Sequence, residues 1–469
     1  MTDTAACPYP LEAFSHAIEG IEHTTDPRRI RVKSRDRYAI SPILKELLAG
    51  KVADVVVSPA NLDELRRVVV AAVHHRIPIT LRAAGSANYG QSVPLKGGIV
   101  LDMMQIKGVV EIDDDRVKVL GGTIVAELEA ALRPHGKELR FHPSTSRIAT
   151  IAGHFAGGQG GPGSVTYGTW RDPGNIISCT VMTVEEEPRL IELRGLDAQL
   201  AHHTYGATGI ITEMELPLAP AWGWREAIVT FDTYMDAVRF GVDLATSTSV
   251  LRKCVSIQEW PVPAFVTDFK DLVPEGKSVV LTMIAEQSFE TFVQMVEQAG
   301  GTVLTQSAEG EGPYHRPIWE FIFGHMLFQI QMNHPERSLV EGFFRTPDLV
   351  GLIAQVHEKV GHYGPMRMEL MRIGGAVVGS GAPYFVYESP EKTADLIRAM
   401  QEAGAVVSNP HTTNVRSVGK KEITDRDLAF KRSVDPYGLL NPGRFEAKES
   451  ADAKFAVNLP TDPWTRRLA

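Results

Sequence analysis

Apolar and polar positions follow a clear pattern from Val52 onward. A short apolar run there predicts a buried strand, and Asn61 caps a predicted helix in which apolar residues recur every three or four positions. The apolar residues of 77–83 predict a second strand, which is followed by a loop of small residues at 83–92. Short strands and a helix from Thr123 to about Leu132 come next. This stretch therefore indicates a region of mixed strands and helices.

A glycine-rich segment from Pro143 to about Gly174 interrupts the pattern, and further predicted strands follow it. Beyond Pro220 the pattern changes. Two strand–helix units of similar length, beginning near residues 226 and 278, form a weak internal repeat and predict a second, mixed sheet with helices on one face. Together these elements predict an α+β fold with a boundary near residue 220.

The composition narrows the class of protein. A chain of 469 residues is too long for one ordinary core, and 43% hydrophobic with 22% charged residues is a usual globular balance. The formal net charge of −9 argues against a nucleic-acid binder, which needs clustered cations. The start shows no signal-peptide pattern, and the apolar runs are shorter than a membrane span. We therefore expect a soluble, cytoplasmic, multidomain protein with no nucleic-acid partner.

The residues that usually bind metals are not spaced as ligands. Cys7, Cys179 and Cys254 lie far apart and fit neither a disulfide framework nor a CxxC site, and no four-cysteine set exists for an iron–sulfur cluster. His357 and His362 are five positions apart, so the stretch they bound does not match HExxH. We expect no metal site.

Residues 158–163, with the sequence GGQGGPG over 157–163, contain a literal G-x-G-x-x-G, and acidic residues 185–187 follow. A nicotinamide-dinucleotide turn requires a strand before the glycines and a helix after them. The preceding ATIAGHFA is not a β-branched strand, and Gly168 and Pro173 prevent a helix of useful length after the turn. The sequence therefore predicts that this is not a Rossmann turn.

Glycines also let a backbone lie against an extended ligand and offer its N–H groups to phosphate or carbonyl oxygens. The loop at 83–92 has the same character, with Ser86, Asn88, Gln91 and Ser92 as side-chain donors. Two such loops would suit a dinucleotide such as FAD. They would equally serve as tight connections in a sheet-rich domain, and the residues alone leave both interpretations open.

Four ordered stretches resemble a known family. They are RAAGSANYGQSVPLKGGIVLDM, HPSTSRIATIAGHFAGGQGGPGSVTYG, YGATGIITEMELPL and DPYGLLNPGRF. They are similar to the FAD-binding p-cresol methylhydroxylase and vanillyl-alcohol oxidase superfamily, closest in motif to its glycolate oxidase and D-lactate dehydrogenase branch. The resemblance implies an N-terminal segment at 1–50, a two-subdomain FAD-binding domain at 51–220, a mixed-sheet substrate (cap) domain at 221–410, and a C-terminal segment at 411–469 that returns to the flavin.

The resemblance also implies which residues contact the cofactor. These are Ala84, Gly85, Ser86, Ala87, Asn88, Gln91 and Ser92 in the first loop, Pro143, Ser144, Thr145, Thr150, Gly153, Gly158, Gly160, Gly161, Gly163 and Ser164 in the second, Ile211 near the adenine and Asn441 near the ring. Covalent members often have His in the first loop or Cys in the second. Ala87 and the 161–164 stretch supply neither, so we expect non-covalent FAD. His142 stands where the hydroxy-acid branch usually has an acidic residue.

The implied activity is FAD-dependent oxidation of a small hydroxylated compound, an acid or an aromatic alcohol, by hydride transfer to flavin N5. Such a reaction needs a group that takes the substrate proton. His411 is the first candidate because it lies shortly before the C-terminal flavin turn, and Arg372 could clamp a carboxylate. Tyr384 is a further candidate acceptor. His325 lies among large apolar residues, a setting that also suits a core histidine.

Other functions share this scaffold. A flavin-dependent lyase or amine-cleaving enzyme would return its electrons to the product, and a flavin subunit of a multi-component dehydrogenase would pass them to a partner. The family's metal-binding members carry an HxxDxNxH-type stretch, which this chain lacks, so lactate, glycolate and 2-hydroxyglutarate are less favoured as substrates. The electron acceptor, whether oxygen, a quinone or another protein, is left open, as is a homodimer.

Overall fold

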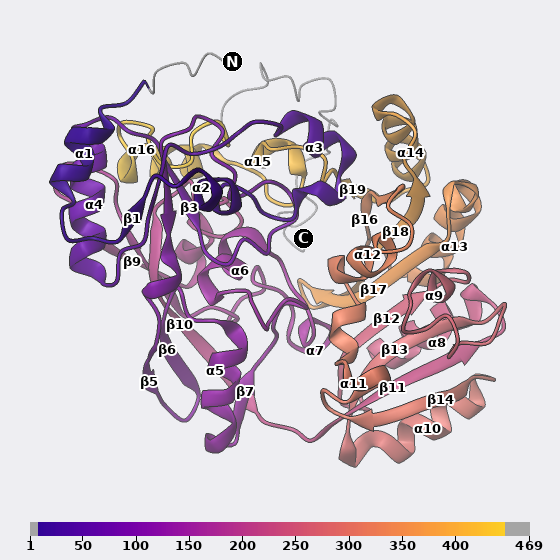
Figure 1. Ribbon diagram of the computed structural model, residues 1–469. Helices are drawn as coiled ribbons and strands as arrows, with labels where there is room; N and C mark the ends of the chain where they lie inside the picture. The colour runs from indigo at the N-terminus through magenta and orange to yellow at the C-terminus, as the bar shows by residue number, and fades with distance from the viewer. Residues whose placement is uncertain (1–7, 446–469) are drawn as a thin grey trace.

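The computed structural model describes residues 8–445, which form three β-sheets covered by helices (Figure 1). The first sheet has the order β1 (His23–Thr24), β2 (Val55–Val57), β4 (Ile99–Asp102), β3 (Ile79–Arg82). β2, β4 and β3 run parallel, whereas β1 is antiparallel to β2. Parallel strands end at the same edge of a sheet, so the loop that leaves β3 begins at that edge.

The second sheet is antiparallel throughout. Its order is β5 (Val109–Ile112), β6 (Arg116–Leu120), β10 (Ile210–Pro220), β8 (Ser178–Met182), β9 (Leu190–Arg194), and β7 (Lys137–Leu139) also pairs with β10. α5 (Val125–Leu132) and α6 (Ile151–Gly157) pack on it, because Leu128 and Phe155 belong to the same apolar cluster as Val119 and Val181. The long strand β10 contacts α6, the helix that leads into the glycine-rich turn.

α4 (Leu62–His74) shows how the sequence pattern produces this packing. The Asn61 side chain accepts a hydrogen bond from the backbone N–H of Glu64 at 2.9 Å, as an N-cap residue does. Leu65, Val68 and Val69 then follow at helical spacing and are fully buried against the first sheet. Both the cap and the apolar stripe agree with the sequence-based prediction.

The third sheet has nine strands and is also antiparallel. Its order is β14 (Thr302–Ala308), β11 (Trp224–Phe231), β13 (Ser278–Ala285), β12 (Arg252–Gln258), β17 (Met366–Ile373), β18 (Ala376–Val386), β16 (Glu341–Phe344), β19 (Val406–Ser408), with β15 (Arg337–Leu339) paired to β18. Each half is a βαββαβ unit, and β12 and β17 join the halves. The weak repeat seen in the sequence is the first of these units.

The prediction of a mixed sheet was wrong. Strand–helix–strand connections predict parallel neighbours, and β11 and β12, joined by α8 (Tyr234–Thr246), do run parallel to each other. However, β13 inserts between them and is antiparallel to both. The strand–helix–strand pattern predicts that β11 and β12 run parallel. It does not show that β13, which comes later in the chain, lies between them.

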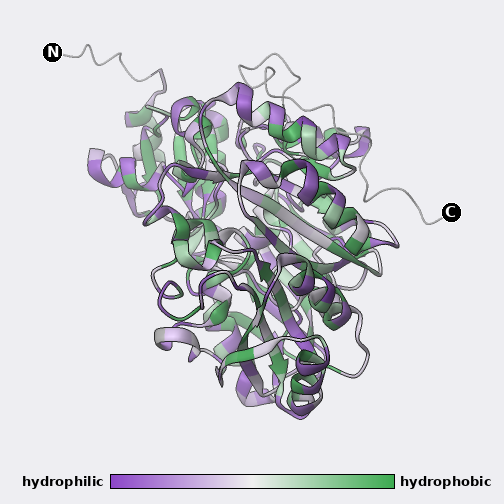
Figure 2. Ribbon diagram, turned by 90° about the vertical axis from the view of Figure 1, so that its right-hand side faces the viewer, coloured by the Kyte–Doolittle hydropathy of each residue, from purple (hydrophilic) through white to green (hydrophobic). Residues whose placement is uncertain are grey.

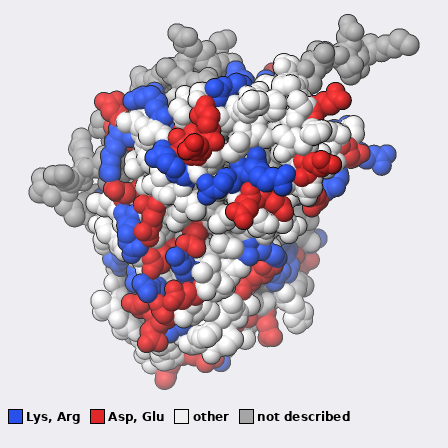
Figure 3. All heavy atoms as spheres, turned by 90° about the vertical axis from the view of Figure 1, so that its left-hand side faces the viewer, with Lys and Arg blue, Asp and Glu red and all other residues white. Residues whose placement is uncertain are grey.

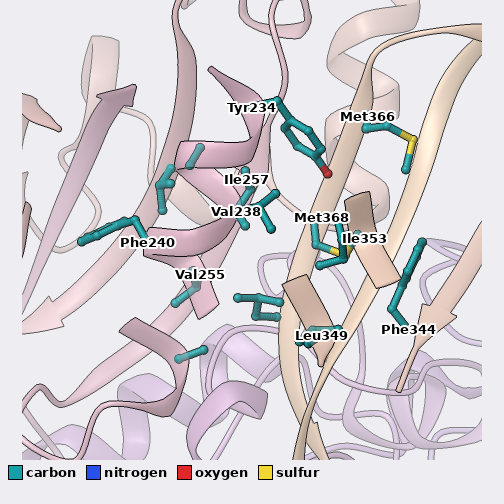
Figure 4. Close-up of a cluster of buried hydrophobic side chains, with 14 of the residues drawn as sticks. Tyr234, Val238, Phe240, Val255, Ile257, Phe344, Leu349, Ile353, Met366 and Met368 are labelled. Atoms are coloured by element: carbon teal, nitrogen blue, oxygen red, sulfur yellow. The ribbon is translucent and has the colours of Figure 1, made fainter. Parts of the chain in front are cut away.

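Long helices cover one face of the third sheet, and segments made of short helices and irregular backbone cover the other. α8, α10 (Phe289–Gln298), α13 (Leu349–Val360) and α14 (Pro390–Glu402) share one large apolar cluster, part of which is drawn in Figure 4. Residues 262–273 and 318–330 share a second cluster with alternate residues of the same strands. Figure 2 shows the helices mixing hydrophilic and hydrophobic residues, as expected where one side packs on a sheet.

The two ends of the described chain meet on the first sheet. α1 (Leu11–Ala17) packs on α4, and α2 (Pro27–Lys33) and α3 (Pro42–Leu47) follow it. From the other end, α15 (Val415–Val418) and α16 (Asp425–Val434) lead to Leu440, which forms a parallel bridge with Ile79 of β3. Residues 446–469 of the predicted C-terminal segment, and Cys7, lie outside the described residues.

The glycine-rich turn lies between two helices, α6 and the four-residue α7 (Ser164–Tyr167). No strand precedes it, so the structure agrees that this is not a Rossmann turn. On the surface, Figure 3 shows Lys and Arg interspersed with Asp and Glu on the face seen from the left of Figure 1. Ion pairs between partly exposed side chains, such as Arg116–Asp113 and Lys107–Glu127, show the same mixing of charges.

Candidate FAD and substrate site

A cleft lies between the first two sheets and the third sheet. Its walls come from the loop after β3, the segment 143–160, the start of β10, α12 (Gly324–Gln331), the strands β16, β17 and β18, and residue 420 of the C-terminal segment. The cleft therefore joins regions that are far apart in the sequence, and it combines backbone-rich walls on one side with side-chain walls on the other.

The loop after β3 presents unused backbone donors to the cleft. None of the described residues accepts a hydrogen bond from the backbone N–H groups of residues 84–88. The loop is held from its other side. Arg37 N–H donates to Ala87 O at 2.8 Å, and the Asp36 carboxylate accepts from the N–H groups of Gly90 and Ser92 at 3.2 and 3.4 Å. Burial raises the pKa of Asp36 to about 6, which these N–H groups oppose.

The C-terminal segment holds the same loop. The fully buried Arg444 donates to the carbonyl oxygens of Gly90 and Val93, and Asn441 Nδ2 donates to Gln91 O at 3.2 Å and to Tyr205 O. Asn441 does not line the cleft. The return of the C-terminal segment to the site agrees with the expectation, but in this structure Asn441 binds the loop backbone.

The glycine segment presents a second set of unused donors. Three consecutive carbonyl oxygens, those of residues 158, 159 and 160, accept hydrogen bonds from buried groups behind the segment. The N–H groups of Gln159 and Gly160 donate to no atom of the described chain, and both residues line the cleft. Successive free N–H groups of this kind bind anions or carbonyl oxygens.

Besides Asn441, three residues of the predicted cofactor set do not line the cleft, namely Gly161, Gly163 and Ser164. Glycine is needed at the first two because a Cβ there would collide with the carbonyl oxygens of His142 and Arg140. Ser164 Oγ accepts from Gly161 N–H at 3.0 Å. These residues fix the turn, and their contact with a cofactor stays a prediction.

The other predicted cofactor residues are gathered along the cleft. These are Ala84, Gly85, Ser86, Ala87, Asn88, Gln91, Ser92, Pro143, Ser144, Thr145, Thr150, Gly153, Gly158, Gly160 and Ile211. Arg82 lies beside them, and its Nε has no hydrogen-bond partner within residues 8–445. This donor set fits FAD, whose phosphate and ring oxygens accept hydrogen bonds, so the two loops and Arg82 are the residues that would hold it.

The opposite wall has an apolar and a polar part. Phe323, Phe328, Phe343 and Met371 supply the apolar part. The polar part consists of Glu341, Ser380 and Lys420, with Lys420 Nζ 2.6 Å from Glu341 Oε2 and Ser380 Oγ donating to Glu341 Oε1 at 2.9 Å. A substrate with an apolar body and a polar end would match this wall.

The buried charges behind this wall set its electrostatics. Burial raises the pKa of Glu341, but Lys420 and Arg367 outweigh it and lower the pKa to about 2. Burial lowers the pKa of Lys420, but the Glu341 carboxylate outweighs it, so the pKa lies above its usual value. Glu369 accepts from Phe323 N–H at 2.7 Å, and burial raises its pKa to about 7. At neutral pH the cleft wall therefore carries a fixed Lys⁺–Glu⁻ pair.

His325 is the one predicted catalytic residue that lines the cleft among the described residues. Its Nδ1 lies 3.1 Å from Ser144 O, which can only accept, so Nδ1 carries the proton. Burial lowers the pKa of His325, so the ring is neutral at pH 7 and Nε2 is left with a free lone pair. His325 therefore offers a proton acceptor.

His411, Arg372 and Tyr384 lie outside the cleft. Both nitrogens of the buried His411 are engaged, Nδ1 with Ser41 Oγ at 2.7 Å and Nε2 with Leu339 O at 3.0 Å. Arg372 Nη1 donates to Gly375 O in the turn after β17, and Tyr384 is fully buried within the third sheet. Their predicted catalytic roles have no support from this placement.

Sequence reasoning missed Glu341 and Lys420. Glu341 is a lone carboxylate in the apolar stretch SLVEGFF, and a buried charge of this kind needs a partner. That signal was present, but the partner is 79 positions away, in a segment without a strong local pattern. Within residues 8–445, no three His, Cys, Asp or Glu side chains are gathered as metal ligands, and no helix is long and apolar enough to cross a membrane.

Comparisons with known proteins point to the same cofactor. The FAD binding domain family matches residues 53–188. The glycolate oxidase subunit GlcD of Bacillus subtilis is 22% identical over 434 residues, covering 85% of this chain and 90% of that protein. The D-lactate dehydrogenase of Archaeoglobus fulgidus is 24% identical over 438 residues, covering 86% and 94%. The D-2-hydroxyglutarate dehydrogenase of Pseudomonas putida is 34% identical over 128 residues, covering 26% and 12%.

The fold also has a solved counterpart. A structure of alkyldihydroxyacetonephosphate synthase matches with a TM-score of 0.69 at 17% identity, covering 94% of this chain and 86% of that one. This likeness confirms the α+β architecture expected from the four motifs. Residues 53–188 therefore match an FAD binding domain, and most of the chain is similar to relatives named as a glycolate oxidase subunit and a D-lactate dehydrogenase.

Proposed function

We propose that the protein is an FAD-dependent dehydrogenase or oxidase that oxidises the CH–OH group of a small hydroxy acid or aromatic alcohol. The observation that carries this proposal is the position of His325. It lines the same cleft as the unused backbone N–H groups of residues 84–88, 159 and 160, and its Nε2 has a free lone pair. When bound, FAD would supply the acceptor for the hydride that leaves the substrate carbon.

The residues of the chain supply the remaining parts of the reaction. His325 Nε2 takes the hydroxyl proton, and its Nδ1–H bond to Ser144 O keeps the ring in the tautomer that can do so. Phe323, Phe343 and Met371 exclude water and contact the apolar part of the substrate. The Lys420 ammonium, fixed by Glu341, donates a hydrogen bond to an oxygen at the polar end.

This wall favours a particular kind of substrate. The relatives are named for glycolate, D-lactate and D-2-hydroxyglutarate, all of them 2-hydroxy acids. The aromatic residues and Met371 favour a 2-hydroxy acid with a larger apolar side chain, and an aromatic alcohol is the second choice. The FAD is proposed to be non-covalent, since the first loop, residues 83–92, has no histidine and no cysteine lines the described cleft. Flavin that remained with the precipitate after denaturation would contradict this.

The test is anaerobic reduction of the FAD-loaded protein, followed by its visible absorbance, with 2-hydroxy acids of increasing side-chain size and with benzylic alcohols. We expect reduction by at least one of them. His325→Gln should slow the reduction by a factor of roughly 10² to 10⁴ without loss of bound FAD. His334→Gln is the matched control, because His334 follows the same helix, α12, and does not line the cleft.

Two results would contradict the proposal. Equal reduction rates for His325→Gln and the wild type would remove His325 as the proton acceptor. Product formation without net consumption of oxygen, quinone or dye would instead indicate the lyase-type alternative, because such an enzyme returns its electrons to the product. Comparing oxygen, a quinone analogue and an artificial dye as acceptors separates an oxidase from a dehydrogenase.

A further inference from the structure

Two adjacent histidines lie behind the glycine segment. His202 and His203 are each 1% exposed and are placed in the loop before β10. His202 Nε2 lies 3.3 Å from Gly158 O, and His203 Nδ1 lies 3.2 Å from the same oxygen. Because a carbonyl oxygen can only accept, both histidines donate to it. One backbone oxygen thus receives two imidazole hydrogen bonds.

The next two carbonyl oxygens are held in the same manner. Trp170 N–H donates to Gln159 O at 3.1 Å, and His154 Nε2 donates to Gly160 O at 3.4 Å. In a trans peptide the C=O of one residue and the N–H of the next point in opposite directions. Drawing the oxygens of residues 158 and 159 toward the interior therefore turns the N–H groups of Gln159 and Gly160 away from it, toward the cleft that both residues line.

The charge state of the pair suits this role. Burial lowers the pKa of both histidines well below the usual value, and the nearby Arg171 and Lys421 lower it further. Both rings are therefore neutral, with one N–H each. His202 Nδ1 and His203 Nε2 have no hydrogen-bond partner within residues 8–445. The single proton of each ring accordingly lies on the nitrogen that faces Gly158.

The backbone of this loop is held in an unusual conformation. His203 and Tyr205 have φ of 51° and 55°, which non-glycine residues rarely adopt. Their N–H groups donate to Phe155 O and Ala156 O in the last turn of α6, at 3.2 and 3.0 Å. The conformation costs free energy that the packing offsets, and such positions concentrate at functional sites. Here it brings both imidazoles onto one oxygen.

We propose that the His202–His203 pair is a positioning device for FAD: by holding Gly158 O it keeps the N–H groups of Gln159 and Gly160 turned toward the cofactor. This inference rests on the proposed non-covalent binding of FAD. It assigns the pair no part in proton transfer. Since two donors share one acceptor, the loss of either leaves the carbonyl held, whereas the loss of both releases it.

The experiment measures the Kd of FAD for the apoprotein by flavin fluorescence, together with the melting temperature of the apoprotein. Single His202→Leu and His203→Leu variants should raise Kd by no more than about threefold. The double Leu variant should raise it at least about thirtyfold, because it misaligns two donors to the cofactor. His202→Gln/His203→Gln, whose amides can donate, should restore Kd to within about threefold of the wild type.

The chain offers a matched control in a second adjacent pair, His74 and His75 at the exposed end of α4. The variant His74→Leu/His75→Leu should leave Kd unchanged. If the double Leu variant at 202 and 203 does not fold, His202→Asn/His203→Asn makes the same test with shorter amides that stop short of Gly158.

The outcomes separate two kinds of failure. A folded double variant with wild-type Kd would overturn the positioning role, as would a Gln pair as weak as the Leu pair. Wild-type protein that cannot be loaded with FAD would instead overturn the proposed function on which the inference depends. A large rise in Kd for either single variant would show that the two histidines do not hold Gly158 O jointly. That result would also overturn the positioning role.

Discussion

The environment of His411 leads to a prediction about stability and pH. The ring is 2% exposed, both nitrogens are engaged, and burial lowers its pKa from 6.5 to about 4. Replacing it by Leu leaves Leu339 O without its donor and Ser41 without one partner. The free energy of unfolding at pH 7.5 should therefore fall by about 3 kcal/mol.

The pH dependence of this cost has a definite sign. Because the folded pKa lies below the unfolded one, the stabilising contribution of His411 is complete above pH 6.5 and is lost as the pH falls toward 4. Between pH 7.5 and 5.5 the unfolded wild type gains a proton that the folded wild type does not. The cost of His411→Leu should therefore shrink by about 1.3 kcal/mol over that interval. Other titrating groups are common to both proteins and cancel in the difference.

The assay is urea unfolding of the wild type and the variant at the two pH values, followed by tryptophan fluorescence. His16→Leu, at an exposed position near the end of α1, is the control, and its effect should stay within about 0.5 kcal/mol at both pH values. If the loss of unfolding free energy caused by His411→Leu stayed constant or grew toward pH 5.5, the assignment of His411 as buried and neutral would be refuted. Turnover lost without any loss of stability would restore His411 as a catalytic base.

Three further predictions concern packing and charge. Gly161→Ala should lower the melting temperature and weaken FAD binding, because its Cβ would collide with His142 O; an unchanged melting temperature would contradict this. Phe240→Ala should cost about 3 to 5 kcal/mol in urea unfolding, and a cost under about 1 kcal/mol would mean that the site collapses around the cavity. Lys420→Met should cost about 3 kcal/mol because it removes the nearer of the two cations that face the buried Glu341 carboxylate, and Lys420→Met/Glu341→Gln should recover most of it; additive costs would refute the pairing.

Local features were predictable from the sequence. The Asn61 cap and the apolar stripe after it predict α4, and the loop of small residues after β3 predicts a backbone-rich wall of the cleft. The four motifs identify the FAD-binding fold because each combines glycines with fixed polar neighbours.

Where the structure departs from the sequence-based expectations, the physical cause is that contacts with residues far away in the sequence decide where a residue lies. Gly161 lies in a cofactor motif, yet it is glycine because of His142 O. His411 lies close in sequence to the C-terminal turn, but Ser41 and Leu339 hold it outside the cleft. The adjacent His202 and His203 did not match the spacing of metal ligands. Their hydrogen bonds to Gly158 O depend on a backbone conformation that no local sequence pattern reveals.

The way both chain ends hold the loop after β3 has a consequence for biosynthesis. Ribosomes make the chain from the N-terminus, so residues 83–92 emerge long before Asn441 and Arg444, which lie 350 or more positions further on and bind the loop's carbonyl oxygens. A nascent chain can form the strands on either side of the loop but cannot yet fix it. Tight cofactor capture is therefore expected only after residues 441–444 have left the ribosome, and a chain that stops before Asn441 should be unable to hold its flavin.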